Sequence, residues 1–240
     1  MTENTRIWIP IRKSILILIL TLIIIVVIAF YNVLLVFTVL AFSFAYLIYI
    51  WRKEEIEREP FMGLIVAFSY GFANSTFLAI ILSYFAIELI GISTGDIFSI
   101  VVVAPLVEEF SKFIGLIIIS NYRMLFNEID DGIIYGASIG LGFSAYENLL
   151  YAMGTNEPIV IASLRSICCT AGHAASTAII GYGYAKNIFL TDTTRLSLYF
   201  ILAILLHVMH NLLAAISPLM IPLIIIIDFT AFIKILSKVE

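Results

Sequence analysis

The chain has 240 residues, of which 62% are hydrophobic and only 12% are charged. Soluble domains are about half apolar and about a quarter charged, so this composition indicates a protein that crosses a membrane several times. With a net charge of −4, the chain has no basic stripe that could neutralise phosphates, which argues against nucleic acid as a partner.

Eight apolar segments are long enough to cross the lipid bilayer, whose hydrocarbon core needs about 20 residues of helix. The segment 61–90 is too long for one upright helix, and we expect it to tilt or to break near Gly71, Asn74 and Ser75. The sequence predicts an all-α, polytopic membrane helix bundle with eight transmembrane helices. In chain order these are 14–30, 32–50, 61–90, 97–119, 132–153, 159–185, 196–216 and 218–236.

The basic residues give the expected orientation of these helices. If the N-terminus is cytoplasmic, all but two of the 13 Lys and Arg residues lie on the inner side, and the outer loops contain none. This is the distribution of the positive-inside rule, so both termini are predicted to be cytoplasmic and the protein to be a multi-pass protein of the cytoplasmic membrane. The two exceptions, Lys112 and Arg165, lie within predicted helices, and Arg165 is near enough to the outer end of its helix to reach the interface.

Ionisable and polar side chains are concentrated in the fourth to seventh predicted helices. An ionisable residue at bilayer depth costs about 2.5–3.5 kcal/mol on insertion scales, and it therefore indicates a functional site. The candidate site residues are Glu108, Glu109, Lys112, Glu147, His173, His207 and Asn211. Three of them, Glu108, His173 and His207, lie within a residue or two of the middle of their predicted helices, and Glu147 lies about four residues, or about 6 Å, toward the outer side.

The spacing of these residues indicates which of them can contact one another on the same helix. Lys112 follows Glu108 by four residues and Glu109 by three, so its ammonium can neutralise one carboxylate and leave the other for chemistry. His207 and Asn211 are four residues apart and share one helix face.

Glycines at every fourth position mark one side of the fifth predicted helix. Gly132, Gly136 and Gly140 form a stripe of small residues, which allows a neighbouring helix backbone to approach closely. Such an approach brings Glu147 within reach of its neighbours.

Two classes of function fit this set of residues. An intramembrane hydrolase could bind a metal through His and Glu, with a second Glu as base, or could activate water with a carboxylate alone. A proton- or ion-coupled transporter or channel could use the same acids and histidines as a relay. The chain shows no inverted repeat, so the sequence favours the hydrolase, with the transporter as the alternative.

Four motifs, in order, resemble those of the PrsW family of intramembrane proteases. They are P-x-x-E-E-x-x-K at 105–112, D-G-x-x-Y-G-x3-G-x-G-F-x3-E-N-x2-Y at 131–151, R-x7-H at 165–173 and H-x3-N at 207–211. The family is distantly similar to the CAAX-processing and bacteriocin-processing membrane proteases, in which a histidine stands where this chain has Glu147. The resemblance implies a membrane-embedded peptidase that cuts membrane-protein substrates, such as an anti-sigma factor, and it keeps a metal-free glutamic mechanism open.

The resemblance also implies a role for each site residue. We expect Glu108 or Glu109 to be the base that activates water, while Lys112 holds the other carboxylate. Glu147, His173 and His207 are expected to bind a divalent metal, Zn²⁺, and Asn211 to donate a hydrogen bond to the oxyanion. His210 is a further candidate ligand that the motif does not require.

The resemblance covers roughly residues 100–215 and divides the chain into three parts. Residues 1–96 hold three N-terminal helices without a matching motif, residues 97–216 form a catalytic core of four helices, and residues 217–240 form a C-terminal helix.

Overall fold

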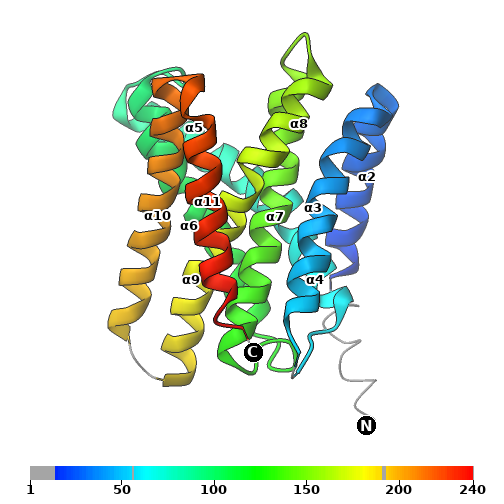
Figure 1. The fold of residues 1–240 in the computed structure, drawn as a ribbon, viewed down its shortest axis with the longest axis vertical. Helices are drawn as coiled ribbons and strands as arrows, with labels where there is room; N and C mark the ends of the chain where they lie inside the picture. Colours follow the sequence, from blue (N-terminus) through cyan, green and yellow to red (C-terminus); the bar gives the residue numbers. More distant parts are fainter. Residues whose placement is uncertain (1–13, 56, 191–192, 240) are drawn as a thin grey trace.

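A computed structural model describes residues 14–55, 57–190 and 193–239, and within these ranges the regular elements are all helices (Figure 1). Arg6, Arg12 and Lys13, which contribute to the predicted orientation, lie outside the described residues. The α-helices are α2 (Ile15–Tyr31), α3 (Val33–Lys53), α4 (Phe61–Ser69), α5 (Thr76–Ile90), α6 (Ala104–Ser120), α7 (Ile129–Met153), α8 (Pro158–Cys168), α9 (Thr170–Leu190), α10 (Thr193–Ile216) and α11 (Ile221–Leu236). Two π-helical segments, η1 (Tyr70–Ser75) and η2 (Ser99–Val103), and one 3₁₀ turn, η3 (Pro218–Met220), complete the described elements.

The all-helical membrane architecture is confirmed. Five helices of the described chain are long and apolar enough to cross a membrane, which makes the protein a multi-pass membrane protein. The other predicted helices, among them α2 and α6 with 17 residues each, fall outside this group, so the number eight stays a prediction. The five are Val33–Lys53, Phe61–Ile90, Pro158–Leu190, Leu196–Ile216 and Pro218–Leu236.

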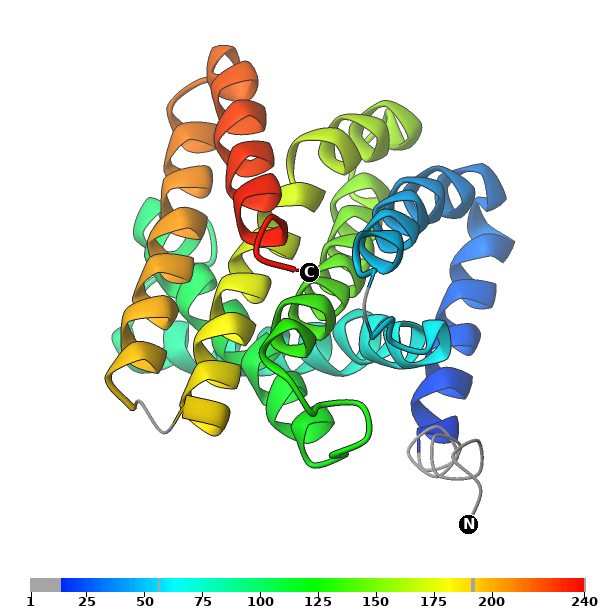
Figure 2. The ribbon, with the colours of Figure 1, turned by 60° about the horizontal axis from the view of Figure 1, so that its bottom comes forward.

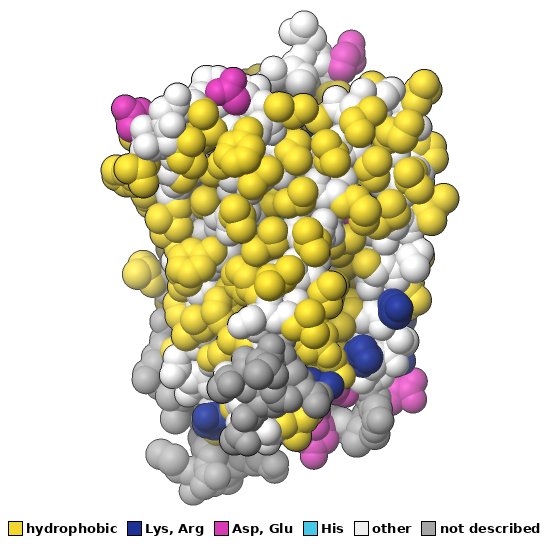
Figure 3. Space-filling view, turned by 90° about the vertical axis from the view of Figure 1, so that its left-hand side faces the viewer, with side chains coloured by type: hydrophobic (Ala, Val, Ile, Leu, Met, Phe, Trp, Pro, Cys, Tyr) yellow, Lys and Arg dark blue, Asp and Glu magenta, His cyan; other side chains and the backbone are white. Residues whose placement is uncertain are grey.

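The surface has the distribution of side chains expected of a membrane protein. Hydrophobic side chains cover most of the height of the face shown in Figure 3, and acidic residues appear at its two ends. Lys and Arg appear only in its lower part, at the end of the bundle where α2 begins and α11 ends (Figure 1). An apolar band between two polar ends matches the hydrocarbon core between two aqueous interfaces.

Two of the predicted helices are irregular in the structure. The segment 61–90 passes through the π-helical turn η1, at the place where the sequence predicts a break, and the Thr76 hydroxyl there donates to the Gly71 carbonyl over 3.1 Å. The segment 159–185, predicted as one helix, is interrupted at Cys169, between α8 and α9. The interruption is slight, because Cys169 keeps helical dihedral angles, and backbone hydrogen bonds of the helical type join it to Arg165 and to His173.

Helix α7 passes through the middle of the bundle, with α9 beside it (Figure 2). The two backbones touch, because a Cβ atom added at Gly132 would collide with the Gly181 carbonyl, and one added at Gly140 would collide with the His173 carbonyl. The glycine stripe predicted from the sequence therefore brings α7 directly against the helix that carries His173.

We expect Gly140→Ala to destabilise the protein by about 1–3 kcal/mol, because the added methyl group must push α9 away from α7. Denaturant-induced unfolding of the detergent-solubilised chain measures this change. Gly95→Ala is the matched control, since no atom lies within 4 Å of a Cβ built there. Equal stability of the two variants would contradict a tight contact between α7 and α9.

Candidate active site

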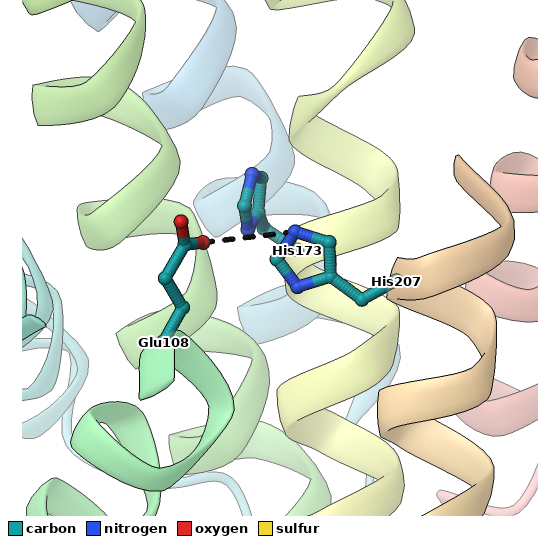
Figure 4. Close-up of side chains that lie close together, drawn as sticks. All are labelled: Glu108, His173 and His207. Carbon is teal, nitrogen blue, oxygen red and sulfur yellow. Dashed lines mark ion pairs between the residues drawn. The ribbon is translucent and has the colours of Figure 1, made fainter. Parts of the chain in front are cut away.

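Three side chains from three helices meet inside the bundle. Glu108 extends from α6, His173 from α9 and His207 from α10 (Figure 4). Each offers one oxygen or nitrogen atom, and these atoms lie within 4.8 Å of one another. The distance from His207 Nε2 to Glu108 Oε2 is 3.6 Å.

Glu147, from α7, contacts the Nε2 atom of His173. Its Oε2 atom is 2.9 Å from His173 Nε2 and also accepts a hydrogen bond of 2.9 Å from the Arg165 guanidinium. Arg165 also donates to the Asn148 side chain over 3.0 Å and lies 3.9 Å from the ring centre of Tyr151. The guanidinium therefore holds Glu147 and Asn148, two neighbours on α7, in fixed positions.

Glu109 and Lys112 form a fully buried ion pair behind this group, with 2.5 Å between Lys112 Nζ and Glu109 Oε1. The same oxygen accepts hydrogen bonds from the Ser176 hydroxyl at 2.9 Å and from His207 Nδ1 at 2.8 Å. Of the two adjacent glutamates, Glu109 is thus the one that Lys112 neutralises, and it orients a histidine.

These contacts fix the tautomer of each histidine. Lys112 Nζ lies 3.2 Å from His173 Nδ1, and an ammonium group only donates, so Nδ1 accepts and the ring proton is on Nε2, facing Glu147. In His207 the Nδ1 proton is donated to Glu109, which leaves the lone pair of Nε2 facing Glu108. A carboxylate behind the second ring nitrogen is the usual support of a metal-binding histidine.

A cavity of about 640 Å³ opens beside these residues. Glu108, Glu147 and His173 line it together with Arg165, whereas Glu109, Lys112 and His207 do not reach it. Asn211 also lines the cavity, where its amide donates to the Ile100 carbonyl of η2 over 2.9 Å. The structure thus gathers the seven predicted residues in one region and divides them into a layer at the cavity and a buried layer behind it.

Three contacts of this region were missed in the sequence. Arg165, which the sequence places near the interface although the R-x7-H motif marks it, donates to Glu147 at the cavity. Ser176 contacts Glu109, and its position three residues after His173 on the same helix face could have indicated that it belongs to the site. Asp228, an acid in the otherwise apolar α11, pairs with His210 Nδ1 at 2.6 Å. An aspartate inside an apolar helix is costly without a partner, so Asp228 could have been predicted to pair with a basic side chain.

Glu108, His173 and His207 fit a divalent metal ion. Glu108 Oε2 is shielded from solvent and has no hydrogen-bond partner among the described residues. A buried carboxylate oxygen without a donor is what a cation-binding site requires. Two imidazoles and one carboxylate are the ligand set of catalytic zinc sites that keep one position open for water or substrate.

Comparison with known proteins agrees with these features. The profile of the PrsW family intramembrane metalloproteases matches residues 59–236. The protein is 30% identical to the protease PrsW of Geobacillus kaustophilus over 169 residues, which cover 70% of this chain and 73% of the relative. It is 29% identical to the protease PrsW of Bacillus subtilis over 175 residues, which cover 68% and 74%. No solved structure matches the chain.

The matched region includes every residue of the site and four of the five helices that can cross a membrane. Proteolysis, and not transport, is the activity for which these relatives are named. The chain belongs to the PrsW family and is a membrane-embedded protease.

Proposed function

We propose that the protein hydrolyses a peptide bond of a membrane-protein substrate within the bilayer, with Zn²⁺ held by Glu108, His173 and His207. The observation that carries this proposal is the cavity of about 640 Å³, whose otherwise largely apolar wall holds two carboxylates and two imidazoles from four different helices. A segment of substrate can enter such a cavity, and the polar groups on its wall are suited to hydrolysis.

When bound, a zinc ion supplies a Lewis acid that polarises the scissile carbonyl and makes water easier to deprotonate. Glu108 and His207 support this ligand set best, because their free atoms face each other and Glu109 fixes the His207 tautomer. Both ring nitrogens of His173 are engaged in the structure, so in this proposal its ring proton moves from Nε2 to Nδ1 when the ion binds, which displaces the Lys112 contact and frees Nε2 as the ligand.

Glu147 is the base in this proposal. It borders the cavity, so it can take a proton from the attacking water, and Arg165 keeps it in place. The sequence suggests the reverse, with Glu147 as ligand and Glu108 or Glu109 as base. The distance between Glu108 and His207 favours the exchange of roles, and the burial of Glu109 away from the cavity argues against it as base.

Asn211 and Arg165 are the donors available to an oxyanion at the cavity. The Asn211 amide is bonded to the Ile100 carbonyl, so a substrate that receives its hydrogen bond must compete with η2. In this proposal, therefore, only a substrate that displaces the Asn211–Ile100 contact is cleaved efficiently.

We further propose eight membrane crossings with both termini in the cytoplasm, and the cytoplasmic membrane as location. The distribution of basic residues supports this orientation, as does the position of the start of α2 and the end of α11 at one end of the bundle (Figure 1). The resemblance to the PrsW family supports an anti-sigma-factor-like membrane protein as substrate.

The three glutamates are expected to respond differently to replacement by glutamine. Glu108→Gln should lose both bound zinc and activity, because it removes a ligand. Glu147→Gln should keep zinc but lose activity by at least about 100-fold, because it removes the base. Glu109→Gln should weaken zinc binding by about 10- to 100-fold through His207. Zinc content of the purified variants and cleavage of a reconstituted transmembrane substrate measure these effects.

Glu88→Gln is the matched control, since Glu88 lies on the exposed side of α5, and it should behave as the wild type. Loss of zinc in Glu147→Gln with zinc retained in Glu108→Gln would reverse the two roles.

Treatment with a zinc chelator such as 1,10-phenanthroline should abolish cleavage, and added Zn²⁺ should restore it, because the proposed ligands hold the ion reversibly. The assay is cleavage of the same substrate in proteoliposomes, with a non-chelating isomer of phenanthroline as control. Full activity in a preparation shown to be free of metal would instead support a glutamic mechanism of the CAAX-protease type.

A further inference from the structure

Helix α3 ends and helix α7 begins at the end of the bundle where α2 begins and α11 ends (Figure 1). A second group of acidic residues, outside the active site, belongs to these helix ends. Glu54 follows the last residue of α3, Glu59 precedes α4, and Asp131 lies in the first turn of α7. The exposed fractions of these three residues are 1%, 6% and 0%. We refer to Glu54, Glu59 and Asp131 as the carboxylate cluster.

The three carboxylates converge on one point. Each contributes an oxygen atom, and these oxygens lie within 4.8 Å of one another. Calcium binds carboxylate oxygens at about 2.3–2.6 Å and magnesium at about 2.0–2.1 Å, so oxygens that share one ion lie within about 5 Å of one another.

Hydrogen bonds satisfy one oxygen of each carboxylate. Glu54 Oε2 accepts from the Glu59 backbone N–H, at 2.5 Å between the two heavy atoms, and Glu59 Oε2 accepts from the Tyr135 hydroxyl. Asp131 Oδ2 accepts from the backbone N–H groups of Asn127 and Glu128, at 2.6 and 2.8 Å. These bonds hold the carboxylates in place from the protein side.

Two further oxygens of the cluster have no partner. Glu54 Oε1 and Asp131 Oδ1 are shielded from solvent, and no nitrogen or hydroxyl donor of the described residues reaches them. The carboxyl groups of Glu59 and Asp131 lie within hydrogen-bond reach of each other, where either a shared proton or a cation would join them. A buried carboxylate oxygen normally has a donor or a cation beside it, so two such oxygens in one cluster indicate a missing positive ligand.

No basic side chain of the described chain supplies that charge. None of the three carboxylates forms an ion pair with a described lysine or arginine. Lys53 and Arg58 each adjoin one residue of the cluster in sequence. Lys53 Nζ donates to the Val239 carbonyl over 3.5 Å, and Arg58 donates to the backbone carbonyl of Glu54 and lies 5.1 Å from the ring centre of Trp51. Three negative charges are therefore costly here without a proton or a cation.

We propose that the carboxylate cluster binds one divalent cation of the oxygen-preferring type, Mg²⁺ or Ca²⁺, which ties the connection between α3 and α4 to the first turn of α7. Three carboxylates without a nitrogen or sulfur ligand favour these ions over zinc. The site is separate from the one proposed for Zn²⁺: Asp131 precedes Glu147 by 16 residues, which is about 24 Å along α7.

Luminescence of Tb³⁺ tests the proposal on the full chain in detergent, after removal of metals with EDTA. Tb³⁺ emits when a nearby aromatic ring is excited, and the cluster contacts two such rings: the Tyr135 hydroxyl bonds to Glu59, and Trp51 Nε1 bonds to the Glu59 carbonyl. We expect sensitised emission that excess Ca²⁺ or Mg²⁺ displaces, and the ion that displaces it at the lower concentration is the preferred one. We also expect the Tm of the stripped protein to rise by about 3–6 °C with that ion.

The variants locate the ion. Glu59→Gln and Asp131→Asn should each weaken Tb³⁺ binding at least about tenfold and remove the rise in Tm, because each removes a charged ligand. Glu55→Gln, an exposed residue of the same connection, should behave as the wild type. Glu108→Gln, which removes a proposed zinc ligand, should keep both effects, so that failure of either site is recognised separately.

Wild-type protein that shows neither displaceable emission nor a rise in Tm with either ion would overturn the proposal, and the cluster would then hold only protons. Unchanged emission in both Glu59→Gln and Asp131→Asn would overturn it as well. If these variants do not fold, the wild-type measurement and the comparison with Glu108→Gln still decide the question.

Discussion

The buried ammonium group of Lys112 is the interaction on which the arrangement of the site depends. It pairs with Glu109, lies 3.2 Å from His173 Nδ1, and lies 4.7 Å from the ring centre of Phe143. A lone charge in this interior would be very costly, so Lys112 and Glu109 stabilise each other. Glu109 fixes the tautomer of His207, because it accepts the Nδ1 proton, and the Lys112 ammonium fixes the tautomer of His173, because it donates to Nδ1.

The contact between α7 and α9 brings Glu147 to His173, the histidine beside the Lys112–Glu109 pair. Glycines allow the two backbones to touch, and Glu147 and His173 then come within hydrogen-bond distance across the contact. Such packing is favoured in a membrane, where small residues allow closer van der Waals contact and lipid supplies no hydrophobic force between helices. Two further segments reach the cavity: the π-helical segment η2 with Ile100, and helix α8 with Arg165.

Much of this architecture could be predicted from sequence, because the bilayer restricts the possible structures. Hydrophobic length predicts the helical segments, the glycine spacing predicts the contact of α7, and the burial cost of Glu108 and His207 marks them as functional. The roles of the two adjacent glutamates could not be predicted, because the spacings i,i+3 and i,i+4 both reach Lys112. The contact of Asp131 with Glu54 and Glu59 was also beyond prediction, since it joins segments about 70 residues apart whose loop residues follow no period.

The central claim is that His173, His207 and Glu108 hold the metal of a protease, and that the cysteines of the adjoining cavity do not bind it. X-ray absorption at the zinc edge of the active, purified protein tests it most directly. The account predicts about one zinc ion per chain with a first shell of two imidazole nitrogens and oxygen, at about 2.0–2.2 Å. A sulfur shell at about 2.3 Å, from Cys168 or Cys169, or full activity in protein without any metal, would contradict it.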